Sequence, residues 1–214
     1  MLQFITHSTP RMNEIQGVEA ALAGGCRWIQ LRMKNVSDEE FIAAGREIGE
    51  MCRNAGATFI LDDRVHLVNF LDADGVHVGK NDMPVAEVRN LLGEDKIIGA
   101  TANSIEDAMK AIEAGADYLG VGPFRFTTTK EKLSPILGAE GLTNLMRAVR
   151  SVSELPVVAI GGIGIADIEE IIKSGVSGIA VSGSILNAPS PEYETEKILK
   201  ELKNGQSDNR RTCI

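Results

Sequence analysis

The chain has 214 residues, of which 43% are hydrophobic, 24% charged and 4% aromatic. This length suits one domain or two small ones, and the hydrophobic fraction excludes general disorder. Its 22 basic and 30 acidic residues give a formal charge of −8, which argues against a nucleic-acid-binding protein, because such proteins cluster Lys and Arg.

One pattern repeats along the chain: a helix-like stretch, a glycine and a short β-rich run. Glycine after a helix is the usual left-handed C-cap, and a β-branched run after it is typical of a buried strand. The predicted strands, in chain order, are Gln3–Thr6, Trp28–Arg32, Thr58–Asp62, Gly75–Val78, Ile97–Ala100, Tyr118–Gly122, Val157–Ile160 and Gly178–Ser182. The best predicted helices are Asp38–Asn54, Ile105–Ala114, Ala139–Val152 and Asp167–Ser174, and the segment Val65–Leu71 is short for a helix.

Eight β-then-α units predict an α/β protein with a single-domain (β/α)8 TIM barrel over residues 1–203. An open doubly wound sheet is the alternative, but no GxGxxG opens the first helix, which argues against a dinucleotide fold. The polar segment 204–214 lacks periodicity, so we expect a disordered C-terminal tail there.

The sequence also bears on where the protein works. No apolar run approaches the ~20 residues of a membrane span, and the start, MLQFITHSTP, does not have the form of a signal peptide. Cys26, Cys52 and Cys213 are too few and too scattered for a disulfide framework or a zinc site. We therefore expect a cytoplasmic protein with reduced thiols and without nucleic-acid or membrane partners, and the sequence is compatible with a homo-oligomer.

Glycines follow the last two predicted strands, in AIGGI (159–163) and AVSGSI (180–185). In barrels these two loops commonly bind phosphate with backbone N–H groups at the carboxyl end of the strands, where the active site lies. Tight βα turns are the alternative explanation, since glycine permits positive φ in either case. Two such loops at the right strand ends favour a phosphate site.

The second strand ends in QLRMK (30–34), whose alternation places Gln30, Arg32 and Lys34 on one side. Polar groups facing a barrel interior are costly unless they meet a ligand or partners. Arginine and lysine suit phosphate oxygens. A solvated strand end with surface ion pairs is the alternative.

Acidic residues follow the next two strands, in LDDR (61–64) and GKND (79–82). Asp63 and Asp82 could together hold Mg²⁺, which takes few protein oxygens and keeps water and phosphate as its other ligands. Helix caps and Asx turns explain them equally well on spacing alone. Further on, the hydroxyls of Thr127 and Thr129 with the ammonium of Lys130 resemble an anion clamp in a long loop, for which a plain solvated loop is the alternative.

Taken together, these motifs resemble those of the thiamine phosphate synthase family from about residue 3 to residue 200. The resemblance rests on motifs in family order: QLRMK, LDDR, DGVHVGKND, IIGATANS, DYLGVGPF with TTTK, VVAIGGI and VSGSI. It implies a (β/α)8 enzyme that is a transferase. Such an enzyme joins 4-amino-5-hydroxymethyl-2-methylpyrimidine diphosphate to 4-methyl-5-(2-hydroxyethyl)thiazole phosphate. The products are thiamine phosphate and diphosphate, and Mg²⁺ is required.

The resemblance also implies roles for individual residues. Contacts to the pyrimidine diphosphate fall on Gln30, Arg32, Lys34, Asp62 and Lys130, with Thr101 near the pyrimidine. The magnesium carboxylates fall on Asp63 and Asp82, and the thiazole phosphate site falls on Thr127, Thr129, Gly162, Ser182 and Gly183. In the dissociative reaction of the family, Arg32, Lys34 and Lys130 would stabilise the leaving diphosphate and are the implied catalytic residues.

The sequence departs from the family pattern at several positions. Asp62 stands where Asn is usual, Asn103 stands where His is frequent, and Arg125-Phe126 replaces a Tyr-Pro pair. VSGS replaces a VSA-type end, so Ser182 and Gly183 could be one register off. The nearest rival is the related thiazole tautomerase, which relies on a histidine near the position of Asn103. A non-catalytic thiazole phosphate-binding barrel is the other alternative.

Overall fold

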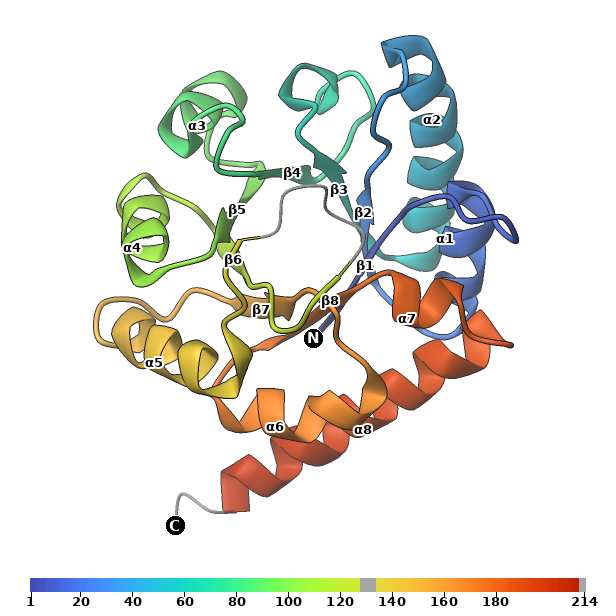
Figure 1. Cartoon of the computed structure of the whole chain (residues 1–214). Coiled ribbons are helices and arrows are strands. Elements are labelled where there is room, and N and C mark those ends of the chain that lie inside the picture. Colours follow the sequence, from blue (N-terminus) through green and yellow to red (C-terminus); the bar gives the residue numbers. More distant parts are fainter. Residues whose placement is uncertain (128–133, 212–214) are drawn as a thin grey trace.

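The eight predicted strands form one closed parallel barrel, seen along its axis in Figure 1. The computed structural model describes residues 1–127 and 134–211, with side chains up to Gly205. Each strand pairs with the next, and β1 pairs with β8 in the register Leu2↔Ile179 and Phe4↔Val181. This last pairing closes the sheet, so the barrel is confirmed and the open sheet is excluded. The strands are β1 (Leu2–Ile5), β2 (Trp28–Leu31), β3 (Thr58–Asp62), β4 (Gly75–Val78), β5 (Ile97–Ala102), β6 (Tyr118–Val121), β7 (Val157–Ile160) and β8 (Gly178–Val181).

Helices surround the strand ring (Figure 1). Over the described residues they are α1 (Glu14–Ala23), α2 (Asp38–Ala55), α3 (Val85–Leu92), α4 (Ile105–Glu113), α5 (Gly138–Arg150), α6 (Ile168–Lys173), α7 (Gly183–Leu186) and α8 (Pro191–Arg211). Short 3₁₀ turns occur at η1 (Val65–Leu67) and η2 (Ile165–Asp167). The weak helix prediction at Val65–Leu71 is therefore realised only as the 3₁₀ turn η1, so β3 and β4 are joined without an α-helix. None of the described helices combines the length and the apolar character needed to cross a lipid bilayer.

Helix α2 shows why the predicted elements begin and end where they do. The Ser37 hydroxyl accepts a hydrogen bond from the backbone N–H of Glu40, and the Glu40 carboxylate accepts one from the N–H of Ser37. This reciprocal cap satisfies two donors at the helix start. At the other end Gly56 takes a φ of 62°, the left-handed conformation that ends the helix at little cost for glycine.

Most of the hydrophobic core lies between strands and helices, and a second cluster of strand residues lies apart from it. This second cluster consists of Ile5, Trp28, Ile60, Tyr118, Val158 and Ala180, with Ile97 and Ile160 packed against it. Because side chains alternate along a strand, one set faces the helices and the other faces the barrel interior. The inner cluster therefore fills the barrel below the carboxyl ends of the strands.

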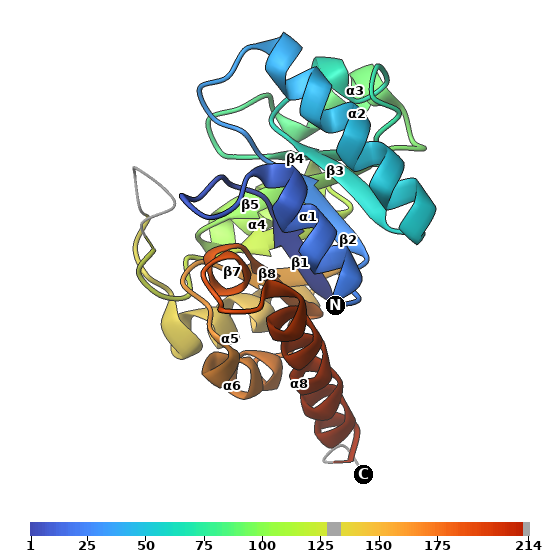
Figure 2. The ribbon, with the colours of Figure 1, turned by 90° about the vertical axis from the view of Figure 1, so that its right-hand side faces the viewer.

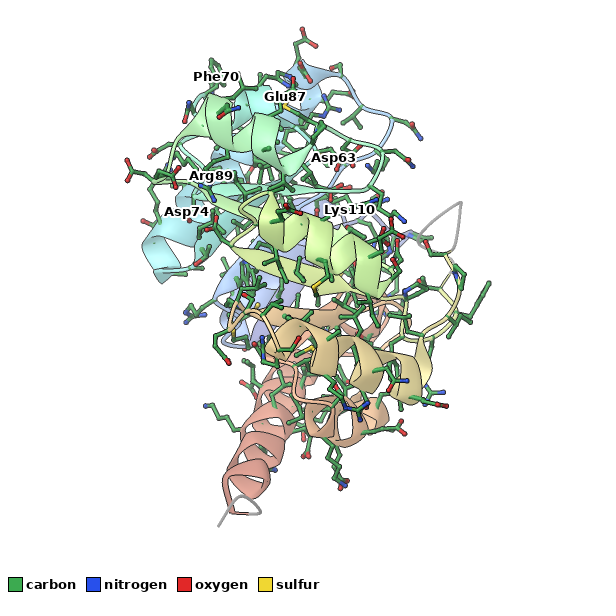
Figure 3. The ribbon with its side chains drawn as sticks, turned by 90° about the vertical axis from the view of Figure 1, so that its left-hand side faces the viewer. Asp63, Phe70, Asp74, Glu87, Arg89 and Lys110 are labelled. Carbon is green, nitrogen blue, oxygen red and sulfur yellow. The ribbon has the colours of Figure 1, made fainter. Side chains whose placement is uncertain are left out.

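The amino ends of the strands are linked by a recurring side-chain bond. Asp74 accepts from the N–H of Phe59 at 2.7 Å, and Asp117 accepts from the N–H of Ile98 at 2.7 Å. Asp74 directly precedes β4 and binds the start of β3, and Asp117 directly precedes β6 and binds the start of β5. Figure 3 shows Asp74 at the other end of the strand ring from Asp63, which follows β3. This end of the barrel is therefore built for stability.

The C-terminal helix differs from the expected tail. Helix α8 packs against α1 and α6 and runs past the barrel to Arg211 (Figure 2), so helix continues into the segment 204–214. Gly205 lies against Ile172 of α6, where an added Cβ would sit 3.4 Å from the Ile172 side chain. The helix thus continues beyond residue 203 and packs on α6 at Gly205, although the sequence there carries no apolar periodicity.

Candidate active site

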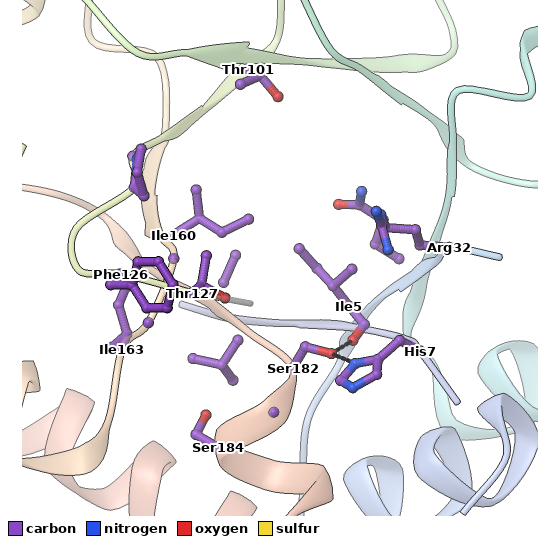
Figure 4. Close-up of a pocket in the computed structure, with 18 of the residues that line it drawn as sticks. Ile5, His7, Arg32, Thr101, Phe126, Thr127, Ile160, Ile163, Ser182 and Ser184 are labelled. Atoms are coloured by element: carbon purple, nitrogen blue, oxygen red, sulfur yellow. Dashed lines mark hydrogen bonds between the residues drawn. The ribbon is translucent and has the colours of Figure 1, made fainter. Parts of the chain in front are cut away.

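A cavity of about 520 Å³ opens at the carboxyl ends of the strands (Figure 4). This is the end at which barrel enzymes place their active sites. The predicted site residues that line it are Gln30, Arg32, Asp62, Thr101, Thr127, Gly162, Ser182 and Gly183. The barrel therefore brings together side chains from β2, β3 and β5 and from the loops after β6, β7 and β8.

Asp62, at the end of β3, is the centre of the polar group on one side of this cavity. Its Oδ1 accepts a hydrogen bond from Nε2 of Gln30 at 2.7 Å. Its Oδ2 lies 3.5 Å from Nε of Arg32 and 3.4 Å from Nζ of Lys34. Gln30 and Arg32 thus meet an internal carboxylate and are not part of a solvated strand end, whereas the Lys34 side chain stays 49% exposed.

Burial controls the electrostatics of Asp62. Desolvation, with a smaller contribution from the neighbouring charge of Asp63, raises the pKa of the Asp62 carboxyl to about 6. Lys34 and Arg32 act in the opposite direction without outweighing burial. The carboxylate therefore changes its charge close to physiological pH.

Replacing Asp62 by asparagine is expected to raise the free energy of unfolding at pH 7.5 by about 1–3 kcal/mol. A carboxyl whose pKa rises on folding binds more protons in the folded state, so its contribution to stability is lost as pH rises through about 6. Asparagine keeps the oxygen that accepts from Gln30. Urea unfolding at pH 5 and pH 7.5 measures this effect, and an equal difference between variant and parent at both pH values would contradict it.

Asp63 and Asp82 form a second acidic group next to the first. Their carboxyl groups are hydrogen-bonded to each other, and Lys34 forms an ion pair with Asp63. Burial acts to raise the pKa of Asp63, but the hydrogen bond with Asp82 and the Lys34 ammonium lower it overall. Burial and the charge of Asp63 raise the pKa of Asp82. Two carboxyl groups in such close contact lie near enough together to share a cation.

The alternative cap roles of these two residues are only partly realised. Helix α3 has Pro84 at its N-cap position, so Asp82 does not cap it; its Oδ2 instead accepts from the N–H of Gly79 at 2.8 Å. Both acids border a neighbouring cavity of about 490 Å³. No cluster of three or more His, Cys, Asp or Glu side chains suited to a metal occurs among the described residues. Two carboxylates with room for water and phosphate fit Mg²⁺, which seldom uses a closed protein cage.

Glycines form the opposite side of the main cavity, as the motifs predict. Gly162 has a φ of 67°, and a Cβ there would lie 2.4 Å from the carbonyl oxygen of Phe126. Only glycine allows the β7 loop to approach the β6 loop this closely. An ion pair also joins these loops: Nε and Nη2 of Arg125 both donate to Oδ1 of Asp167, at 2.8 and 2.6 Å. Arg125, which differs from the family pattern, therefore has a structural role.

Ser182 is held by two bonds, both drawn in Figure 4. Its hydroxyl donates to the carbonyl oxygen of Ile5 and contacts Nδ1 of His7 at 2.6 Å. Since a hydroxyl has one proton, the His7 nitrogen must be the donor in the second bond. Ser182 thus joins the end of β8 to the end of β1, and its hydroxyl proton is already used.

Sequence reasoning missed two residues that line the cavity, His7 and His77. Nε2 of His77 lies 2.9 Å from the hydroxyl oxygen of Thr101. Its alternation with the buried valines of β4 was the available signal for an inward position. Thr129 and Lys130 lie outside the described residues. Arg32, Lys34, Asp63 and Asp82 lie at one end of the barrel: Arg32 and Lys34 meet at Asp62, Lys34 also pairs with Asp63, and Asp63 interacts with Asp82.

Comparison with known proteins agrees with this architecture. A thiamine-phosphate synthase of Bacteroides fragilis is 53% identical over 199 residues, which cover 92% of this chain and 98% of the relative. One of Flavobacterium psychrophilum is 40% identical over 202 residues, or 94% and 98% of the two chains. The solved thiamine phosphate pyrophosphorylase of Pyrococcus furiosus superposes with a TM-score of 0.85 at 36% identity, covering 95% of this chain and 96% of that one. Because the family description thiamine monophosphate synthase also matches residues 2–185, the chain belongs to the thiamine monophosphate synthase family.

Proposed function

We propose that this protein is a thiamine phosphate synthase. It would join 4-amino-5-hydroxymethyl-2-methylpyrimidine diphosphate to 4-methyl-5-(2-hydroxyethyl)thiazole phosphate and release diphosphate. The observation that carries the proposal is the two-sided cavity. Arg32 and Asp62 line one side, where Lys34 pairs with both Asp62 and Asp63, and close-packed glycine loops lie on the other. One side suits a diphosphate with its counterion, and the other suits a single phosphate.

The substitution needs no activated side-chain nucleophile. The bond between the pyrimidine methylene carbon and the diphosphate oxygen breaks, and the electron pair leaves with diphosphate. The thiazole nitrogen then uses its own lone pair to form the new bond to carbon. The residues therefore have two tasks, which are to stabilise negative charge on the leaving group and to align the two rings.

Arg32 and Lys34 are proposed as catalytic cations on the diphosphate, together with Lys130. In the structure Arg32 and Lys34 lie against Asp62, so a bound diphosphate would compete with this carboxylate for the same donors. Gln30 and Thr101, which both line the cavity, are proposed to bind the pyrimidine part. A preorganised cationic site of this kind stabilises charge without reorganisation during the reaction.

Asp63 and Asp82 are proposed to hold Mg²⁺. When bound, Mg²⁺ neutralises charge on the diphosphate and makes it a better leaving group. Both carboxylates would face the cation, and Lys34 would be freed for phosphate. The hydrogen-bonded pair and the neighbouring cation support this assignment.

Thr127, Thr129, Gly162, Ser182 and Gly183 are proposed to bind the thiazole phosphate. Gly162 and Gly183 would offer backbone N–H groups, and the Ser182 hydroxyl would fix the loop. The tautomerase alternative is less well supported, because Asn103 holds the position of the histidine it would use. Its amide donates to the carbonyl oxygen of Gly122 and accepts from Ser134.

We also propose that the protein works in the cytoplasm on small molecules. The buried free thiols of Cys26 and Cys52 suit a reducing compartment. The net charge of −8 is unfavourable for nucleic acid.

The test of the proposed function is direct. The purified protein is mixed with both substrates, with and without Mg²⁺, and thiamine phosphate is measured by chromatography. We expect product only with both substrates and the metal. Product from neither condition, together with isomerisation of a thiazole carboxylate phosphate, would instead establish the tautomerase.

Lys130→Ala is expected to lower kcat on the order of 100-fold, because one of three proposed cations on the leaving group is lost. Lys96→Ala, at a lysine that donates to the carbonyl oxygen of Ala73 between β3 and β4, is the matched control and should keep near-parental kcat. Near-normal turnover of Lys130→Ala would refute the role of Lys130.

A further inference from the structure

A chain of polar side chains crosses the interior of the barrel up to the cavity. Nε2 of Gln3 donates to the hydroxyl of Tyr118 at 3.1 Å, and this hydroxyl lies 3.0 Å from Nδ1 of His77. Nε2 of His77 lies 2.9 Å from the hydroxyl of Thr101, which lines the cavity. Gln3, Tyr118 and His77 are only 1%, 2% and 7% exposed. Their hydrogen bonds are therefore made almost entirely within the protein.

The neighbouring strands leave space for this chain. A Cβ on Gly99 would lie 2.1 Å from Cζ of Tyr118, and a Cβ on Gly120 would lie 3.0 Å from Cε1 of His77. Both glycines lie within strands, where they have no turn to form. Trp28 packs on the Tyr118 ring in an edge contact, with ring centroids 4.8 Å apart. The two rings are thus held in place by the barrel itself.

The number of protons fixes the direction of the hydrogen bonds. Tyr118 accepts from Gln3, and burial raises the pKa of the Tyr118 hydroxyl, so it keeps its one proton. Among the described residues only Nδ1 of His77 is placed to accept that proton. The opposite arrangement would leave a buried hydroxyl without an acceptor, which costs about 1–3 kcal/mol.

It follows that Nδ1 of His77 is the acceptor and Nε2 carries the hydrogen. Nε2 then donates to the oxygen of Thr101, and the proton of Thr101 must point elsewhere. Figure 4 shows the Thr101 side chain directed into the cavity. The chain of bonds therefore presents a hydrogen-bond donor to whatever occupies this point.

We propose that Tyr118 and His77 are positioning residues that make Thr101 an obligatory hydrogen-bond donor, selecting a heteroaromatic substrate with an unprotonated ring nitrogen at this point. The inference rests on the proposed function, because the ring concerned is the pyrimidine of the diphosphate substrate. It adds to that function the feature of the ring that is recognised. A ring that offers C–H or N–H there leaves Thr101 without an acceptor.

The first experiment does not depend on catalysis. ¹⁵N NMR at about pH 8 reports which ring nitrogen of His77 carries the hydrogen. With three histidines in the chain, the His77→Gln variant identifies the signal. We expect the Nε2–H tautomer in the parent and a mixture of tautomers in Tyr118→Phe. An Nδ1–H tautomer in the parent would overturn the proposal.

The second experiment measures recognition. Thr101→Val should lower kcat/KM for the pyrimidine diphosphate by about 10–100-fold, with KM for the thiazole phosphate unchanged, and Thr101→Ser should restore it. Two analogues, each with one ring nitrogen replaced by C–H, are then compared. On one of them parent and Thr101→Val should react equally, because the accepting nitrogen is absent. An unchanged penalty on both analogues would overturn the proposal, whereas a parent protein that forms no thiamine phosphate would refute the proposed function instead.

Discussion

Asp82→Asn is expected to lower kcat for thiamine phosphate formation by about 100-fold or more and to raise the Mg²⁺ concentration needed for half-maximal rate. The substitution removes one of the two carboxylates proposed to hold the cation, and an effect of several kcal/mol on the leaving group follows from such a loss. The amide oxygen of asparagine can still accept from the N–H of Gly79. The turn after β4 should therefore stay intact, and the loss should be confined to chemistry.

Steady-state rates at a series of Mg²⁺ concentrations measure this effect. Asp95→Asn is the matched control, because Asp95 is an exposed acid in the loop before β5. Circular dichroism and the melting temperature should be unchanged in both variants. A parental rate and Mg²⁺ dependence in Asp82→Asn would remove Asp82 from the proposed metal site.

Gly99→Ala is expected to destabilise the fold by about 3 kcal/mol or more, the largest stability effect we anticipate. The added methyl group would lie 2.1 Å from Cζ and 2.5 Å from the hydroxyl oxygen of Tyr118. The Tyr118 ring cannot move away easily, because it lies in the filled interior of the barrel and bonds to Gln3 and His77. Thermal unfolding should show a melting temperature lower by roughly 6–12 °C.

Gly164→Ala is the matched control for this measurement. A Cβ on Gly164 would have Asp167 Oδ2 as its nearest neighbour, at an ordinary 3.7 Å. The φ of Gly164 is −111°, which alanine adopts readily. The control should melt within a few degrees of the parent. If Gly99→Ala melts there too, the interior of the barrel is less tightly packed than the structure indicates.

The barrel could be predicted from the sequence because the patterns that mark its strands and helix ends are local. Several strands are short buried runs that follow a helix ending at glycine, such as β2 after Gly24 and β3 after Gly56, and such signals do not depend on distant residues. The start of α3 was harder to place. Asp82 looked like its cap, but Pro84 takes the N-cap position and the helix begins at Val85.

The composition of the site was also largely accessible from the sequence, since the carboxyl ends of parallel strands meet at one end of a barrel. Its internal bonds were not. Asp62 accepts from Gln30, 32 residues earlier, and Tyr118 meets Gln3 from 115 residues away. No local pattern records such pairs, because they depend on strand register around the closed ring. The inward position of His77 was indicated by alternation, but its partners were not.

The bonds from Asp74 and Asp117 to the preceding strands have a counterpart at Ser177, whose hydroxyl accepts from the N–H of Val157 at 3.2 Å. Three of the αβ units are thereby fastened to their neighbours at the end away from the cavity, without help from the loops around it. Because these bonds lie at the amino ends of the strands, the loops at the opposite end can be exchanged without removing them. Loops exchanged with those of a relative should alter substrate preference, while the bonds of Asp74, Asp117 and Ser177 continue to stabilise the strand ring.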